Sequence, residues 1–128
     1  MLKKIFLVVF FAILLPFSVN AQTIPSEFHG KWKISTASDC STFAIIGAQE
    51  YTTDSEWGMS KVKMVEPMPD SSFEVKGVES YPDEGKVFKV PNKINLKFED
   101  GLLRISGEYH KNDFNETYIK CTKEDDDR

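Results

Sequence analysis

Apolar and polar residues alternate through most of the chain after residue 28, and this two-residue period predicts β-strands. The clearest run is 93–99, where Ile94, Leu96 and Phe98 share one face and polar residues occupy the other. Further runs of the same kind cover residues 28–36, 43–53, 56–66, 72–81, 86–90, 103–109 and 115–122. No long helical period occurs after residue 22. The pattern therefore predicts seven or eight short strands.

Short turn sequences separate these runs, at 67–71, 82–85, 99–101 and 110–113. Glu99-Asp100-Gly101 is a good hairpin turn because glycine tolerates positive φ. A series of strands joined by short turns predicts a meander, and closing it into a barrel removes its exposed edges. A sandwich is the main alternative, but it usually needs a long crossing connection, which this sequence lacks. We therefore expect an all-β protein, a small antiparallel up-and-down β-barrel with a lipocalin-like architecture.

Three positions interrupt the alternation. Gly47 indicates a kink or bulge inside the run 43–53. In the run 56–66 the apolar phase changes near Ser60 and Lys61, which predicts a β-bulge there. Pro91 cannot donate to a ladder, so its strand must break or lie on an edge at that point.

Residues 1–21 are typical of a cleaved secretory signal peptide. Lys3 and Lys4 precede an apolar run at 5–15, Pro16 breaks it, and Val19-Asn20-Ala21 offers small residues before Gln22. A retained helix is the alternative, although the apolar run is shorter than the roughly 20 residues of a membrane anchor. We expect a soluble exported protein, periplasmic or extracellular, with a barrel domain at 22–122 and an acidic tail at 123–128.

Charge and cysteine content narrow the function classes. Removing Lys3 and Lys4 with the signal lowers the formal net charge from −4 to −6, which disfavours nucleic acid as a partner. Cys40 and Cys121 are the only cysteines, and in an oxidising compartment we expect them to form a disulfide. The alternative makes Cys40 a nucleophile with His29 or His110 as its base.

The first strand opens with Pro25-Ser26-Glu27-Phe28-His29-Gly30-Lys31-Trp32, which resembles the start of the calycins, the superfamily of lipocalins, avidins and related barrels. The resemblance implies that Trp32 closes one end of the barrel and that a basic side chain from a late strand stacks on its indole. The counterparts in this chain are Lys120 and Arg104. Small bacterial protease inhibitors with a lipocalin-like barrel are close in size, but their disulfide lies earlier in the chain.

The resemblance favours binding without catalysis. The first hypothesis is a barrel that holds a small apolar or amphipathic molecule, although its bulky residues could instead fill the interior. The predicted ligand contacts are Trp32, Trp57, Met59, Phe73, Phe98 and Tyr109. The second hypothesis is a protein-binding barrel, such as an inhibitor of an exported protease or other hydrolase, with residues 22–27 as the contact segment.

An enzyme is the third hypothesis. His29 and His110, assisted by Asp39, Glu108 or Asp113, are the only acid-base candidates, and nothing in the sequence fixes their mutual geometry. The sequence has no metal-ligand spacing, phosphate loop or nucleophile elbow. We expect no enzymatic activity, cofactor, metal or membrane anchor. The ligand or partner and the oligomeric state stay open.

Overall fold

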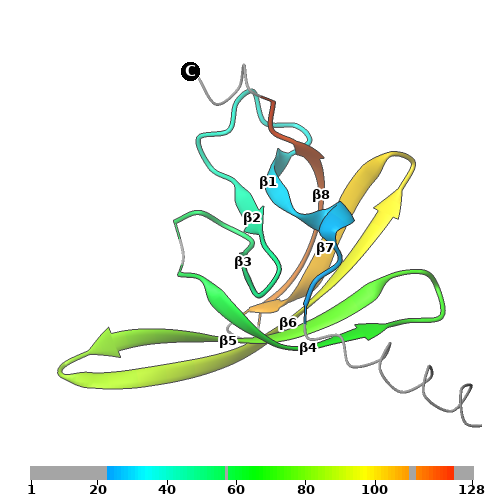
Figure 1. Ribbon diagram of the computed structural model, residues 1–128. Helices are drawn as coiled ribbons and strands as arrows, with labels where there is room; N and C mark the ends of the chain where they lie inside the picture. The colour runs from blue at the N-terminus through cyan, green and yellow to red at the C-terminus, as the bar shows by residue number, and fades with distance from the viewer. Residues whose placement is uncertain (1–22, 57, 110–111, 123–128) are drawn as a thin grey trace, which may run out of the picture.

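The computed structural model describes residues 23–56, 58–109 and 112–122. Its elements are the 3₁₀ helix η2 (Ser26–Phe28) and the strands β1 (Gly30–Ile34), β2 (Ala44–Ile46), β3 (Glu50–Thr52), β4 (Ser60–Pro67), β5 (Phe73–Asp83), β6 (Lys86–Glu99), β7 (Leu102–Tyr109) and β8 (Asn112–Lys120). Each strand pairs antiparallel with the next, and β1 also pairs with β8 (Figure 1). The predicted all-β, up-and-down barrel is confirmed, with eight strands in the described residues.

The barrel closes where β1 meets β8, with Trp32 opposite Lys120 and Ile34 opposite Tyr118. The predicted disulfide is also confirmed, because Cys40 in the β1–β2 connection is bonded to Cys121, just after β8. Next to it, the N–H of Cys121 donates to the carbonyl oxygen of Lys31 at 2.8 Å. A covalent link therefore reinforces the seam that closes the barrel.

Two irregularities differ from the predictions. The run 43–53 is two short strands, β2 and β3, because the chain reverses after Gly47, whose N–H donates to the carbonyl of Glu50 at 2.8 Å. The bulge in β4 lies between Val62 and Met64, two residues later than expected. As a result Val65 faces the core, and Met64 is 47% exposed on the outside.

Strand β6 passes through Pro91 without a break. Proline is accepted there because β6 pairs with β7 only from Lys93 onward, so its other edge is free at Pro91. The edge alternative of the prediction is therefore confirmed. Beyond the barrel wall, residues 80–89 of β5 and β6 form a two-stranded arm that projects from the body (Figure 1).

The core fills the barrel between the two ends. Residues from β5, β6 and β7 such as Val75, Leu96, Leu103 and Ile105 are fully buried. The predicted turn at Glu99-Asp100-Gly101 joins β6 to β7. The expected signal segment 1–21 and acidic tail 123–128 lie outside the described residues. Among the residues that are described, no helix is long and apolar enough to cross a membrane.

Candidate functional site

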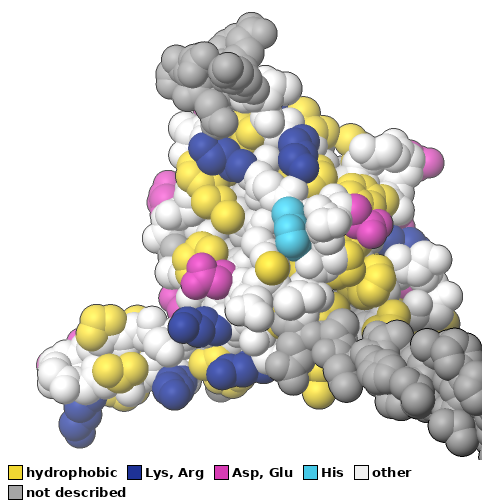
Figure 2. Space-filling model, in the orientation of Figure 1, with side chains coloured by type: hydrophobic (Ala, Val, Ile, Leu, Met, Phe, Trp, Pro, Cys, Tyr) yellow, Lys and Arg dark blue, Asp and Glu magenta, His cyan; other side chains and the backbone are white. Residues whose placement is uncertain are grey.

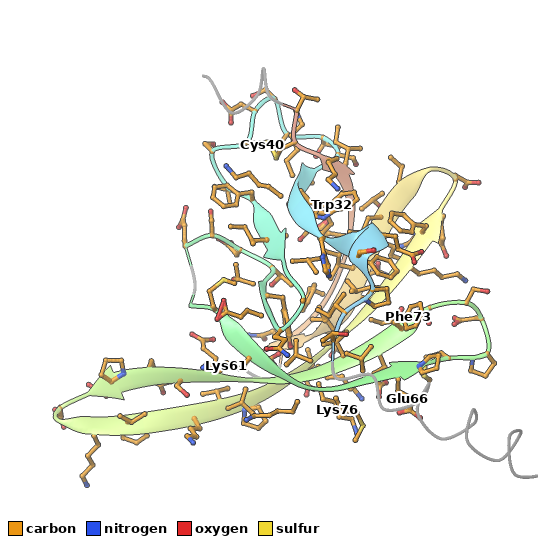
Figure 3. The ribbon with its side chains drawn as sticks, viewed as in Figure 1. Trp32, Cys40, Lys61, Glu66, Phe73 and Lys76 are labelled. Carbon is orange, nitrogen blue, oxygen red and sulfur yellow. A yellow bond between two sulfur atoms is a disulfide. The ribbon has the colours of Figure 1, made fainter. Side chains whose placement is uncertain are left out.

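One end of the barrel is closed by an aromatic plug, formed by Phe28, Trp32, Phe73 and Phe98. The Phe28 and Phe98 rings stack with centroids 4.8 Å apart, and the Phe73 ring meets Phe28 edge-on at 5.7 Å. The Trp32 ring lies 6.0 Å from that of Phe98. Figure 3 shows Trp32 and Phe73 among the side chains gathered inside the barrel. This end holds packed aromatic rings rather than a binding pocket.

The calycin-type contact predicted for Trp32 is present, and Lys120 provides it. The Lys120 ammonium lies 4.9 Å from the centroid of the Trp32 ring and donates a 2.7 Å hydrogen bond to the carbonyl of His29. The indole N–H donates to the carbonyl of Phe28 at 3.0 Å, which ties the strand to η2. Gly30 has φ +136°, a backbone conformation that favours glycine, and a Cβ there would displace the end of the Lys120 side chain.

The other basic candidate, Arg104, lies elsewhere. Its guanidinium donates to Glu99 at 2.7 Å and to Asn115 at 2.8 Å, and none of these contacts involves Trp32. The pKa of Glu99 is lowered, chiefly by the hydrogen bond from Arg104. Arg104 therefore links β6, β7 and β8 on the outer surface and does not contact the plug.

The segment before η2 packs at the same end of the barrel as the plug. Ile24 is 1% exposed, its N–H donates to the carbonyl of Ala48 at 2.8 Å, and its own carbonyl is 2.6 Å from Nε2 of His29. The predicted contact segment 22–27 therefore contains Ile24, whose side chain is buried in the barrel. A free contact segment for a partner protein cannot include Ile24 without opening this end of the barrel.

A polar layer lies above the plug. The Tyr51 hydroxyl donates to Oδ1 of Asn92, whose amide donates to the Ser60 hydroxyl at 2.8 Å. Burial raises the pKa of Tyr51. The space remaining beside these groups is about 10 Å³, which holds at most one water molecule. The interior is thus filled from the plug to this layer.

The opposite end, which we call the mouth, is open. It is a cavity of about 270 Å³. Its walls come from β1, β8 and the loops next to β2 and β3, namely Ile34, Ala37, Thr42, Phe43, Thr53, Asp54, Phe114, Glu116 and Tyr118. The register places Phe114, Glu116 and Tyr118 on the inner face of β8, because Glu116 and Tyr118 stand opposite the buried residues Ile105 and Leu103. Most of the wall is apolar or aromatic.

Two carboxylates give the mouth its charge. Glu116 and Asp54 both act on the buried hydroxyl of Tyr118, whose pKa is raised to about 12 by burial first and by these two negative charges next. The Asp54 carboxylate is held by the N–H of Glu56 at 2.8 Å. No Lys, Arg or His side chain is among the described residues that line this cavity. The Lys31 ammonium contacts the ring of Phe43, 4.3 Å from its centroid.

The six ligand contacts predicted from the sequence are dispersed. Trp32, Phe73 and Phe98 belong to the plug, and Met59 is 38% exposed just before β4. Trp57 and the side chain of Tyr109 lie outside the described residues. None of the four described side chains lines the mouth.

The mouth residues were missed, although the sequence held a signal for them. Lys120 shares its strand face with Tyr118, Glu116 and Phe114, so choosing Lys120 as the partner of Trp32 already places these three inside the barrel.

Cys40 is not available as a nucleophile, the alternative raised from the sequence, because its sulfur is bonded to that of Cys121. His29 lies at the plug end, and His110 is outside the described residues. Within 23–56, 58–109 and 112–122 no cluster of residues is suited to bind a metal ion. Comparison with known proteins adds no assignment: no protein-family model matches the chain, and no curated protein or solved structure is significantly similar to it.

Proposed function

We propose that the protein is an exported, non-enzymatic binding barrel that holds one small amphipathic molecule at its mouth. The observation that carries this proposal is the cavity of about 270 Å³ above a packed interior. That volume is just below the range of about 300–1,000 Å³ found for ligand pockets, and well above that of a single water. A molecule of modest size fits, whereas a long lipid chain would meet the layer of Tyr51 and Asn92.

The charge of the mouth favours a ligand with a cationic group. Glu116 and Asp54 place negative charge at a cavity whose described lining has no basic side chain. The rings of Phe114 and Tyr118 add to this preference, because aromatic faces attract cations, whereas the ring of Phe43 is already in contact with the Lys31 ammonium. Apolar walls at Ile34 and Ala37 favour a short hydrocarbon body. The ligand class supported best is therefore a small organic ammonium.

Two further features support the wider assignment. The signal-like segment 1–21 and the disulfide are consistent with export to an oxidising compartment. Trp32, capped by Lys120 and joined to a 3₁₀ helix, is similar to the closed end that the calycin resemblance implies. The alternative of a protease-inhibiting barrel is less well supported, because its predicted contact segment contains the buried residue Ile24.

Three probes that differ only in their head group test the proposal: hexylammonium, hexanol and hexanoate, titrated into the ¹⁵N-labelled protein and followed by NMR chemical shifts. We expect hexylammonium to bind most tightly, hexanol less tightly and hexanoate least. The shifts should centre on Ile34, Phe114 and Tyr118. If no probe perturbs these residues, the mouth is not the binding site.

Variants distinguish the contribution of the negative charge to ligand binding from that of the cavity. Glu116→Gln should weaken hexylammonium binding roughly five- to tenfold, equivalent to about 1 kcal/mol, and leave hexanol unchanged. Glu66→Gln removes an equal charge from the exposed outer face of β4 and should change neither. Ala37→Phe should block all three probes by filling the cavity. Equal affinity for hexanoate and hexylammonium would contradict the cationic preference while leaving the site in place.

A further inference from the structure

The outer face of β4, β5 and β6 carries a cluster of lysines that the mouth does not use. We call this the lysine face; it consists of Lys61, Lys63, Lys76, Lys89 and Lys93. The register brings them together, with Lys76 opposite Lys93 and Ser80 opposite Lys89 across β5 and β6. Figure 2 shows Lys and Arg side chains gathered where the projecting arm joins the body. Lys61 and Lys63 are two residues apart in β4 and therefore share this side of the sheet, and the bulge that follows Val62 adds Met64 to it.

Three of these lysines border a groove of about 270 Å³. Lys61 and Lys63 stand on one side of it and Lys89 on the other, with Val78 and Ser80 between them. Its described lining contains no carboxylate. The side chains of Lys61, Lys63, Lys76 and Lys89 make no hydrogen bond or ion pair with any residue that the structure describes. Only Lys93 has a partner, Glu74, at 3.9 Å.

The acidic residues of this sheet lie away from the groove. Glu66 and Glu74 pair at the far end of β4 and β5, and Figure 3 shows Glu66 and Lys76 directed away from the barrel. Glu79 is buried on the opposite face of β5, while Asp83 and Glu84 occupy the tip of the arm. A chain with a net charge of −4 thus presents a local excess of positive charge on one face. Such a face is attracted to an anionic surface and orients the molecule toward it.

The same face also exposes apolar side chains. Val87 is 68% exposed and Met64 is 47% exposed, and both lie on the side of the sheet that carries the lysines. Lysine stems can lie along such apolar groups and keep their ammonium groups at a polar boundary. Basic groups together with apolar groups on one side of an element are typical of binding at a lipid interface.

Two observations disfavour a protein partner at this face. Protein interfaces are enriched in aromatic residues and Arg and depleted in Lys, whereas this face has five lysines, and the aromatic pair Tyr81 and Phe88 points to the other side. Strand addition to the arm is hindered as well, because Pro82 stands on one free edge and Pro91 stands on the other strand just beyond the arm.

We propose that the lysine face docks the protein peripherally on an anionic lipid surface. Each lysine near such a surface strengthens partitioning by roughly fivefold, because it gains about 1 kcal/mol. The lysines contact the phosphate groups, and Val87 and Met64 enter the interface between them. This inference is independent of the mouth, since the two sites share no residue.

Co-sedimentation with vesicles tests the proposal on residues 22–128. We expect binding to phosphatidylcholine vesicles that contain about one quarter phosphatidylglycerol, and little binding to pure phosphatidylcholine. Raising the salt from about 0.1 M to about 0.5 M should release the protein. Lys61→Gln/Lys89→Gln should weaken binding roughly thirty-fold. The matched control Lys31→Gln/Lys97→Gln, with the same charge change elsewhere, should weaken it much less.

The outcomes are separable. Lys61→Arg/Lys89→Arg keeps the charge and should keep the binding, which distinguishes loss of charge from loss of fold. Equal binding to neutral and anionic vesicles, or equal weakening by both Gln pairs, would overturn the proposal. Release by glycerol phosphate at constant ionic strength would also overturn it, because it would indicate a site for a free phosphate in the groove.

Discussion

Gly107 offers the sharpest test of the barrel itself. It stands opposite Ile94 where β6 and β7 pair, and opposite Phe114 where β7 and β8 pair. A Cβ at this position would lie 2.2 Å from the carbonyl oxygen of Lys93 and 2.9 Å from Cα of Ile94. Both neighbours are backbone atoms, so Gly107→Ala requires β6 and β7 to move apart.

The expected cost follows from that movement. Losing one or two ladder hydrogen bonds costs about 1–2 kcal/mol, and the overpacking adds about 1–3 kcal/mol. We expect the free energy of unfolding to fall by about 2–5 kcal/mol. For a typical urea m-value of about 1.5 kcal/mol/M, the midpoint of unfolding falls by roughly 2 M. The same loss lowers Tm by more than about 10 °C for a domain of this size.

Gly47→Ala is the matched control for this experiment. Its Cβ would lie 3.5 Å from the nearest atom, the carbonyl oxygen of Glu50, which is an ordinary contact. We expect its free energy of unfolding to stay within about 0.5 kcal/mol of that of the parent protein. If Gly107→Ala is as stable as Gly47→Ala in urea, the register of β6 with β7 is wrong and the reasoning fails.

Three further perturbations have defined outcomes. Trp32→Phe leaves the buried carbonyl of Phe28 without its 3.0 Å hydrogen bond, so we expect the free energy of unfolding to fall by about 1–3 kcal/mol in thermal denaturation. An unchanged Tm would contradict the role of the indole in the plug. Cys40→Ser/Cys121→Ser opens a loop of 81 residues and should lower the free energy of unfolding, measured in urea, by about 4.5 kcal/mol if chain entropy dominates. A decrease of less than about 1 kcal/mol would contradict that account. The pKa of Tyr118 is about 12 in the folded protein and ordinarily 10, so the unfolded state ionises first and stability falls as pH rises from 10 to 12. Tyr118→Phe should lessen this fall by about 1–2 kcal/mol, and an identical pH profile would contradict it.

The sequence was sufficient for the architecture because strand alternation and turn residues are local signals. Ile94, Leu96 and Phe98 share a face in any register, and the turn at Glu99-Asp100-Gly101 needs only its own residues. The position of the β4 bulge depends instead on which residue of β5 stands opposite Val62, and no local pattern holds that information. Gly47 was interpreted as a kink for the same reason, since a reversal and a bulge both favour glycine.

The candidate site was less accessible to sequence reasoning. Large aromatic residues such as Phe73 and Phe98 were selected as ligand contacts by size, but size equally suits a plug. The mouth instead combines residues from the first and last strands, including Ile34 from β1 and Tyr118 from β8. Their proximity exists only once the barrel has closed.

The link between Cys40 and Cys121 also bears on how the barrel folds. Pairing β1 with β8 joins the two ends of the domain, which makes it the contact with the largest loop-closure cost. In the oxidised chain those ends are already tethered beside the seam, so the contact becomes effectively local. We therefore expect the oxidised protein to refold faster than the reduced protein in stopped-flow experiments. Oxidation would then govern the speed of closure as well as the strength of the closed barrel.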